Sequence, residues 1–220
     1  MMKVTRQMPP IIFFSGIDGS GKTVVIENLI KELNQQGFKT RYVWMRYNHY
    51  LSKLLLAVCR LTGFTKYHQI AGHKLGVHHF YRSRIISYLF IFSSLIDTAV
   101  ATFLKLLLFL NRTDAVIVCD RFVIDILVDL MIDTRKFDLF DCLWGQAFKR
   151  LVAPHARTFY IRRPLKEIID VRPESEYDTT FLMRVVLYEH LVRKWKIETI
   201  DNAGSLADVH KDISSRIGIQ

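Results

Sequence analysis

A run of eight residues near the N-terminus has the composition and spacing of a phosphate-binding loop. It follows the apolar stretch Ile11–Ser15, precedes a helical pattern, and has the sequence Gly16-Ile17-Asp18-Gly19-Ser20-Gly21-Lys22-Thr23. Glycines let the backbone curl so that its N–H groups face phosphate oxygens, and the start of the following helix adds a positive dipole end. We expect Lys22 to reach the β- and γ-phosphates of ATP and the Thr23 hydroxyl to coordinate Mg²⁺. The loop therefore predicts nucleotide binding through Gly16, Gly19, Ser20, Gly21, Lys22 and Thr23.

A second group of chemically useful residues ends an apolar strand. The run Val116–Cys119 is continuously apolar and is followed by Asp120 and Arg121. An acid in this place holds Mg²⁺ or its water shell in nucleotide-binding folds, and a guanidinium beside it binds phosphate. The alternative is that Asp120 only caps the next helix while Arg121 is solvated. Together with the loop at 16–23, the pair favours a magnesium and phosphate site.

The elements that must position these residues alternate between strand and helix. Strands are expected at five short runs: Ile11–Ser15, Thr40–Trp44, Ala115–Cys119, Thr158–Ile161 and Glu198–Ile200. The first helix is expected over 22–36, because Gly37 is a typical stop signal. Continuously apolar strands separated by helices are typical of a parallel sheet covered on both faces. We therefore predict an α/β fold, a P-loop three-layer sandwich with a five-stranded parallel sheet, as a single domain over 1–220.

The charge distribution indicates an anionic partner. The 220 residues are 50% apolar and 24% charged, and the net charge is +10. No Asp or Glu lies between Glu32 and Asp97, a region with nine Lys or Arg and five His residues. Such a region favours a nucleotide, a nucleic acid or an acidic membrane surface, although no recognised nucleic-acid module is present. Three widely spaced cysteines and a polar N-terminus predict a cytoplasmic protein.

Two further segments need their own interpretation. The apolar stretch Ile85–Leu110 is interrupted by Asp97 and Lys105, so its longest uncharged run has 12 residues. A membrane span needs roughly 20 apolar residues, so we predict a buried core helix, and contact with lipid or another subunit stays open. The histidines of Thr65–His79 are interpreted as surface residues near an anion-binding face. A metal site is the minor alternative, because their spacing fits no usual zinc site.

From end to end, the chain resembles the thymidylate kinase family of nucleoside monophosphate kinases. The phosphate loop is similar to that of the family and includes Asp18, which in the family faces the sugar of the acceptor nucleotide. The segment Trp44–Tyr47 resembles the family's arginine loop, which implies that Arg46 binds the acceptor phosphate. Asp120-Arg121-Phe122 resembles the family's Asp-Arg-aromatic triplet, and Arg121 is expected to share that phosphate.

The same resemblance extends to the C-terminal part. Ile200–Ile213 is similar to the segment that packs against adenine in the family, and Ala203 is implied as a nucleotide contact. A lid is implied at about 162–178, with Arg172 as the cation that closes over ATP. Arg162 and Arg163 are alternatives for that role. The implied catalytic residues are Lys22, Arg172, Asp120 and Asp18.

The resemblance implies transfer of the γ-phosphoryl group of ATP, with Mg²⁺, to dTMP or a related nucleotide, and a homodimer. Ser15, Tyr47-Asn48 and Thr98 depart from the family, and Thr98 stands where the family has an Arg that contacts the base. Two alternatives therefore stay open: a non-nucleotide or membrane-linked phosphate acceptor with peripheral membrane contact, and nucleotide binding without catalysis. A hydroxyl acceptor needs a general base, and the neighbourhood of Arg46 contains no acid.

Overall fold

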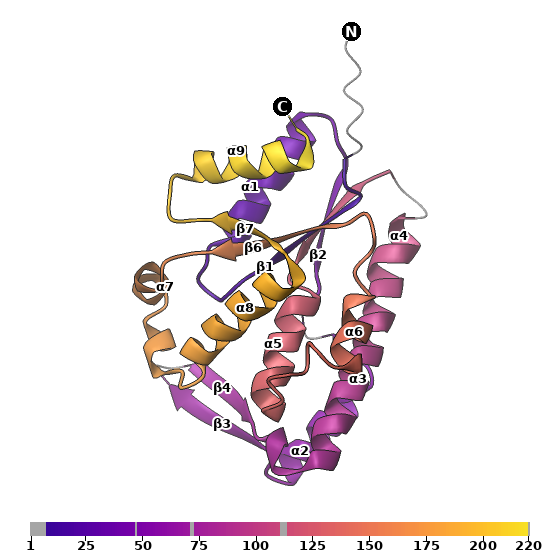
Figure 1. The fold of residues 1–220 in the computed structure, drawn as a ribbon, viewed down its shortest axis with the longest axis vertical. Coiled ribbons are helices and arrows are strands. Elements are labelled where there is room, and N and C mark those ends of the chain that lie inside the picture. The colour runs from indigo at the N-terminus through magenta and orange to yellow at the C-terminus, as the bar shows by residue number, and fades with distance from the viewer. Residues whose placement is uncertain (1–7, 47, 71–72, 111–113, 220) are drawn as a thin grey trace.

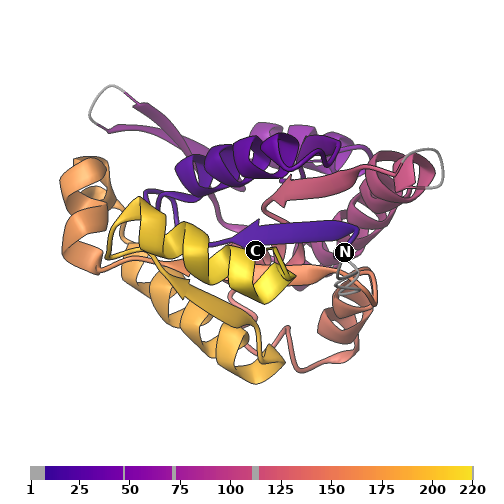
Figure 2. The same ribbon diagram turned by 90° about the horizontal axis from the view of Figure 1, so that it is seen from above.

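A central parallel sheet organises the molecule, as the sequence predicted. The computed structural model describes residues 8–46, 48–70, 73–110 and 114–219. Its five-stranded sheet has the order β2-β5-β1-β6-β7, and every neighbouring pair is parallel. The strands are β1 (Ile11–Ser15), β2 (Thr40–Trp44), β5 (Val116–Asp120), β6 (Arg157–Arg162) and β7 (Glu198–Asp201). Helices cover both faces of this sheet (Figures 1 and 2), which gives the three-layer α/β sandwich.

Side chains of β1 show why the sheet needs two helical layers. Ile11 and Phe13 belong to one apolar core cluster, while Ile12 and Phe14 belong to the other, and all four are at most 1% exposed. Successive strand residues point to opposite faces, so an unbroken apolar strand must be covered on both sides. Burial of each such side chain contributes roughly 1.5–3 kcal/mol. The core therefore fixes the strand that leads into the phosphate loop.

The helices fall into two groups around the sheet. One face packs against α1 (Lys22–Gln35) and α9 (Leu206–Ile217). The core on the other face is formed largely by α3 (Arg84–Thr102), α5 (Val123–Thr134), α6 (Leu143–Lys149) and α8 (Phe181–Trp195). Shorter elements are α2 (Ser52–Leu61), α4 (Leu108–Leu110), α7 (Leu165–Val171), the 3₁₀ turns Phe80–Arg82 and Pro173–Tyr177, and the π-helical turn Phe103–Leu107.

The segment 65–79, to which the sequence analysis assigned no element, contains a hairpin. Strands β3 (Thr65–Ile70) and β4 (His73–His78) pair antiparallel, with Thr65 opposite His78. They form a separate two-stranded sheet that extends from the body of the molecule (Figures 1 and 2). The sequence of this hairpin is rich in charged residues and histidines. It therefore lacks the clear alternation of apolar and polar residues by which a strand is recognised.

The apolar segment 84–110 is, within the described chain, the one helical stretch long and apolar enough to cross a membrane. In the structure 44% of its apolar window is buried, and α3 packs against α2, α5 and α6. Asp97 lies buried in the middle of α3, where its carboxylate accepts hydrogen bonds from the backbone N–H groups of Leu51 at 2.6 Å and Ser52 at 3.0 Å. The charge that interrupts the apolar run therefore anchors the start of α2.

Candidate active site

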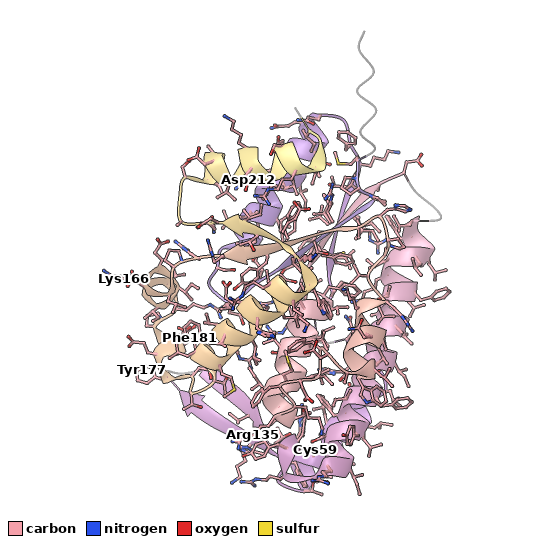
Figure 3. The ribbon with its side chains drawn as sticks, viewed as in Figure 1. Cys59, Arg135, Lys166, Tyr177, Phe181 and Asp212 are labelled. Carbon is pink, nitrogen blue, oxygen red and sulfur yellow. The ribbon has the colours of Figure 1, made fainter. Side chains whose placement is uncertain are left out.

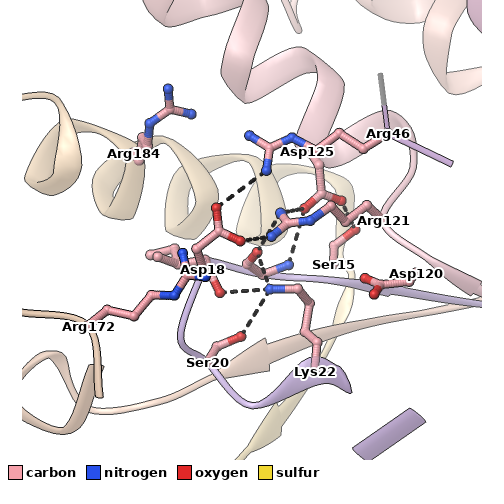
Figure 4. Close-up of polar contacts among 12 residues, drawn as sticks. Ser15, Asp18, Ser20, Lys22, Arg46, Asp120, Arg121, Asp125, Arg172 and Arg184 are labelled. Atoms are coloured by element: carbon pink, nitrogen blue, oxygen red, sulfur yellow. Dashed lines mark hydrogen bonds and ion pairs between the residues drawn. The ribbon is translucent and has the colours of Figure 1, made fainter. Parts of the chain in front are cut away.

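The phosphate loop connects β1 to α1 and encloses its own lysine. The Nζ of Lys22 donates hydrogen bonds to the carbonyl oxygens of Gly16 and Ile17, both at 2.7 Å, and lies 3.3 Å from the Ser20 hydroxyl (Figure 4). Burial, together with the nearby charge of Arg121, lowers the pKa of Lys22 to about 7. A phosphate group near this amine would favour its charged form. In this structure the loop therefore holds, through its own carbonyl oxygens, the amine expected to reach the phosphates of ATP.

Two glycines of the loop are required by close approaches of the backbone. A Cβ at Gly16 would lie 2.7 Å from the carbonyl oxygen of Ile161, and the φ angle there is +150°. Gly21 has a φ of +86°, and a Cβ there would collide with the side chain of Asn202. The Asn202 amide donates a 2.7 Å hydrogen bond to the Ser20 carbonyl oxygen, so the end of β7 holds the loop. Asn202 was not predicted as a site residue.

Asp120 ends β5 with an oxygen that no protein group satisfies. Its Oδ2 accepts a 3.1 Å hydrogen bond from the Tyr42 hydroxyl, whereas its buried Oδ1 has no hydrogen-bond partner among the described residues. Burial raises the pKa of this carboxyl group. An orphaned buried carboxylate oxygen is unfavourable unless a cation or a water shell completes it. With the Thr23 hydroxyl as the second expected ligand, this oxygen fits a site for Mg²⁺ or its bound water.

The three residues expected at the acceptor phosphate lie together. Asp18 forms an ion pair with Arg121 and another with Arg46, whose Nη1 is 3.4 Å from the carboxylate (Figure 4). Burial alone would raise the pKa of Asp18, but Arg121, Lys22 and Arg46 outweigh it and lower that pKa to about 2. The side chain of Asp18 is 47% exposed. It therefore lies between the two guanidinium groups and remains partly open to solvent.

A fully buried carboxylate holds Arg121 from behind. Asp125 accepts hydrogen bonds from Arg121 at 3.0 Å, from the Ser15 hydroxyl at 2.7 Å and from the Tyr188 hydroxyl at 2.8 Å. Its side chain is 0% exposed, and it also accepts from the N–H of Phe122 at the start of α5. Charge-assisted hydrogen bonds from several directions fix a carboxylate firmly. Asp125 thus positions Arg121 and ties α5 and α8 to the strand before the phosphate loop.

A second carboxylate organises the other arginine. Asp129 accepts hydrogen bonds from Arg46 at Nε and Nη2, both at 3.0 Å, and from Nη1 of Arg184 on α8. The two arginines line a cavity of about 150 Å³ with residues of α2, β4, α3 and α5. Figure 3 shows the side chains of these elements, with Cys59 of α2 and Arg135, just after α5, labelled at one end of the molecule. Arg46, which pairs with both Asp18 and Asp129, connects this partly open cavity to the Asp18 ion pairs.

The expected lid contains helix α7 and the 3₁₀ turn that follows it. Arg172 lies between these elements, with its side chain directed toward the phosphate loop and its Cδ 3.5 Å from a Cβ built on Gly19 (Figure 4). Arg163 donates to Glu167 at 2.8 Å, and Arg162 donates to Asp201 at 3.1 Å. Those two alternatives for the lid cation are thus engaged in ion pairs, while Arg172 has a long contact of 3.9 Å to Glu174.

Two further predictions concern Ala203 and the histidines of segment 65–79. Ala203 is exposed just after β7, and its N–H donates to the Asp201 carboxylate at 3.1 Å. The histidines of 65–79 contribute to no group of three or more possible metal ligands within the described chain. His78 contacts the Thr65 hydroxyl at 3.0 Å, and burial lowers its pKa to about 4.

Besides Asn202, sequence reasoning missed four residues that hold the arginine side chains of the site. Asp125 and Asp129 are four residues apart in a helical pattern that begins just after Arg121, a spacing that places both carboxylates on one side of α5. That spacing was a usable signal. The other two, Arg184 and Tyr188, come from α8, which is distant in sequence, and no local pattern connects them with Arg121.

Comparisons with known proteins support the fold. No family model matches the chain, and no curated protein matches its sequence. Among solved structures, a thymidylate kinase from Ehrlichia chaffeensis superposes with a TM-score of 0.53, over 94% of this chain and 97% of that chain, at 18% sequence identity. The fold is therefore similar to that of a thymidylate kinase. At this identity the similarity concerns the fold, and any conclusion about the acceptor must come from the residues of this chain.

Proposed function

We propose that this protein is a phosphotransferase that moves the γ-phosphoryl group of ATP to the phosphate of a small acceptor. One observation supports it above the others: the phosphate loop with Lys22 lies directly beside the arginine pair Arg46 and Arg121, with Asp18 between them. Two adjacent anion sites suit a reaction that joins two phosphates, because the reacting groups must be held in line at close approach.

The proposed reaction needs no general base. An oxygen of the acceptor phosphate, which is already ionised, attacks the γ-phosphorus of ATP and forms a new P–O bond. The bond from that phosphorus to the β,γ-bridging oxygen breaks, and ADP leaves with the electron pair. Lys22 and Arg172 would stabilise negative charge on the transferring group. Arg46 and Arg121 would bind the acceptor phosphate once Asp18 releases them, and Asp18 would then be free to accept a hydrogen bond from the acceptor.

Mg²⁺ would be held by Thr23 and Asp120, whose orphaned oxygen fits that role. Such an ion, when bound, neutralises charge on the β- and γ-phosphates. Asp120 has the further role of keeping the Tyr42 hydroxyl engaged, since that hydroxyl donates to its other oxygen at 3.1 Å. Chelation with EDTA is expected to abolish turnover, and excess Mg²⁺ to restore it.

Two classes of acceptor are candidates. Nucleoside monophosphates, thymidylate among them, are suggested by the likeness to the Ehrlichia chaffeensis thymidylate kinase. A non-nucleotide phosphate is favoured by a different observation. Asp97, Asp129 and Asp133 all line the cavity behind the arginines, and a carboxyl group can accept a hydrogen bond from a hydroxyl group of the acceptor. Both classes leave the donor side of the proposal unchanged.

The donor side is tested by ADP release from Mg-ATP across a panel of nucleoside monophosphates and other small phosphates. Lys22→Ala should reduce turnover by at least about a thousandfold, a loss of about 4 kcal/mol of transition-state stabilisation. Lys31→Ala, an exposed lysine later on α1, is the matched control and should retain the activity. Equal turnover in the Lys22 variant and the wild type would refute the proposal, and ATP binding without any transfer would favour a non-catalytic nucleotide-binding protein.

A further inference from the structure

The cavity behind the arginine pair offers little aromatic surface. Among the described residues that line it, Phe90 is the only Phe, Tyr or Trp. Phe90 is 6% exposed, and its ring packs on Phe80 with centroids 4.3 Å apart. Stacking of a nucleobase on an accessible aromatic face contributes roughly 1–3 kcal/mol per base. This cavity does not supply such a face from Phe90, so its chemistry must be sought in its polar groups.

Most polar groups of the cavity are already engaged with the protein. Asp97 holds the start of α2, and Asp129 holds Arg46 and Arg184. The Thr98 hydroxyl donates to the Ser94 carbonyl oxygen at 2.6 Å. These groups line the cavity, but their hydrogen bonds are made to the protein itself. They therefore do not need a bound ligand as a partner.

Asp133 differs from its neighbours. It lines the cavity from the last turn of α5, and within the described chain no hydrogen bond or ion pair engages its carboxyl group. Burial, together with the charge of Asp129, raises the pKa of Asp133 well above its usual value. Its oxygens are not among the buried side-chain atoms that lack a partner, so solvent reaches them, and a ligand hydroxyl in the cavity can donate to them. Asp133 therefore gives the cavity a carboxyl group that is available to a ligand.

We infer that the acceptor is a phosphorylated sugar, with its phosphate at Arg46 and Arg121 and a ring hydroxyl at Asp133. The inference rests on the proposed phosphotransfer and names its acceptor class. A cavity of about 150 Å³ is smaller than the roughly 300–1,000 Å³ of sites for drug-sized ligands, which suits one compact polar ring. The reaction joins the acceptor phosphate oxygen to the γ-phosphorus, so the products are ADP and a sugar that carries a diphosphate.

The test compares two matched panels at equal Mg-ATP: nucleoside monophosphates, and hexose and pentose phosphates with the phosphate at carbon 1 or at the terminal carbon. ADP release gives the rates, and ³¹P NMR identifies the phosphoanhydride of a sugar diphosphate. We expect kcat/KM for at least one sugar phosphate to exceed that of every nucleotide by tenfold or more. A nucleoside monophosphate as the best acceptor would overturn the inference and leave the proposed phosphotransfer standing. No turnover with either panel, while ATP still binds, would overturn both.

A substitution tests the role of the carboxyl group itself. Asp133→Asn replaces one of the two carboxyl oxygens by an NH₂ donor while keeping the shape of the side chain, and it should raise KM for the sugar phosphate by about tenfold. The KM for ATP should stay unchanged. Asp138→Asn, an exposed residue outside the cavity, is the matched control for the loss of one negative charge. Thermal unfolding checks that both variants fold. An unchanged sugar-phosphate KM in folded Asp133→Asn would refute the assignment.

Discussion

Replacement of Asp125 by Asn should destabilise the protein far more than the loss of any one of its hydrogen bonds. The carboxylate is 0% exposed and accepts from Arg121, Ser15, Tyr188 and the N–H of Phe122. An amide at this position would turn its NH₂ group toward at least one of these donors. The guanidinium of Arg121, whose side chain is 7% exposed, would also lose its buried counter-charge.

The expected magnitude follows from the geometry. Breaking a buried ion pair by removing one partner costs about 3–5 kcal/mol. Arg121 would keep its ion pair with Asp18, but that carboxylate is 47% exposed and therefore better screened. We accordingly expect the lower end of the range, about 3 kcal/mol in the free energy of unfolding. Tyr188→Phe removes one hydrogen bond to the same carboxylate and should cost only about 1 kcal/mol.

Urea unfolding followed by tryptophan fluorescence measures both variants. For an m-value of about 3 kcal/mol/M, the Asp125→Asn midpoint should fall by about 1 M and that of Tyr188→Phe by about 0.3 M. Arg121→Met combined with Asp125→Leu should recover part of the loss, because the buried charge disappears together with its partner. If Asp125→Asn unfolded at the same urea concentration as Tyr188→Phe, the account of Asp125 as the buried anchor of Arg121 would be wrong.

Four further results are expected. Binding of ATP at pH 8 should take up nearly one proton, because phosphate raises the Lys22 pKa from about 7. Titration calorimetry in buffers of different ionisation enthalpy measures this proton uptake, and Lys22→Met should abolish the uptake. Gly21→Ala should weaken ATP binding by at least about tenfold, since a φ of +86° costs a side chain about 1–2 kcal/mol and the new Cβ collides with the side chain of Asn202. Gly37→Ala is the control for the backbone cost in binding assays, because a Cβ at Gly37 has no atom within 4 Å. Arg172→Gln should lower kcat by at least about tenfold with little change in ATP affinity, because a lid cation acts mainly on the transferring group; equal losses in both would contradict that role. The exposed apolar face of α3 should be covered by a second copy of the chain, so light scattering should give a dimer. Leu89 is 49% exposed, and Leu89→Glu should convert the dimer to monomers. A wild-type monomer that floats with anionic vesicles would instead indicate that this face binds a membrane surface.

The sheet could be predicted from the sequence because its signal is local. Ile11–Phe14 is an unbroken apolar run that ends at Ser15-Gly16, Val116–Cys119 is another that ends at Asp120, and each has the length of one buried strand. The strand predicted over 115–119 lies at Val116–Asp120 in the structure, so Asp120 ends the strand itself. The lid expected to end at about 178 is followed by α8, which begins at Phe181. Shifts of this size are normal at the ends of elements, where the hydrogen bonds are incomplete.

The acceptor side was less predictable because its geometry is long-range. Nothing near Arg46 in the sequence indicates that Asp129 holds its guanidinium, since the two residues are 83 positions apart. Asp97 was interpreted as an interruption of an apolar helix, and its role as the anchor of α2 depends on a contact 46 residues away. Local patterns thus predict which groups could bind phosphate, whereas the three-dimensional packing decides which of them face one another.

The conformation of Arg121 also has a consequence for how the molecule can vary. It is one of three described non-glycine residues with a positive φ, at 65°, and its N–H donates to the Phe14 carbonyl oxygen at 2.7 Å. A side chain held there against its preference is typical of a position that selection maintains. Because Asp120 and Arg121 are joined by one peptide bond, the two side chains proposed to hold a metal and an acceptor anion leave the backbone at Cα atoms about 3.8 Å apart. Substitutions elsewhere can change the lid or the cavity lined by Arg46 and Arg184. The separation of these two Cα atoms can change only if the backbone at the end of β5 changes.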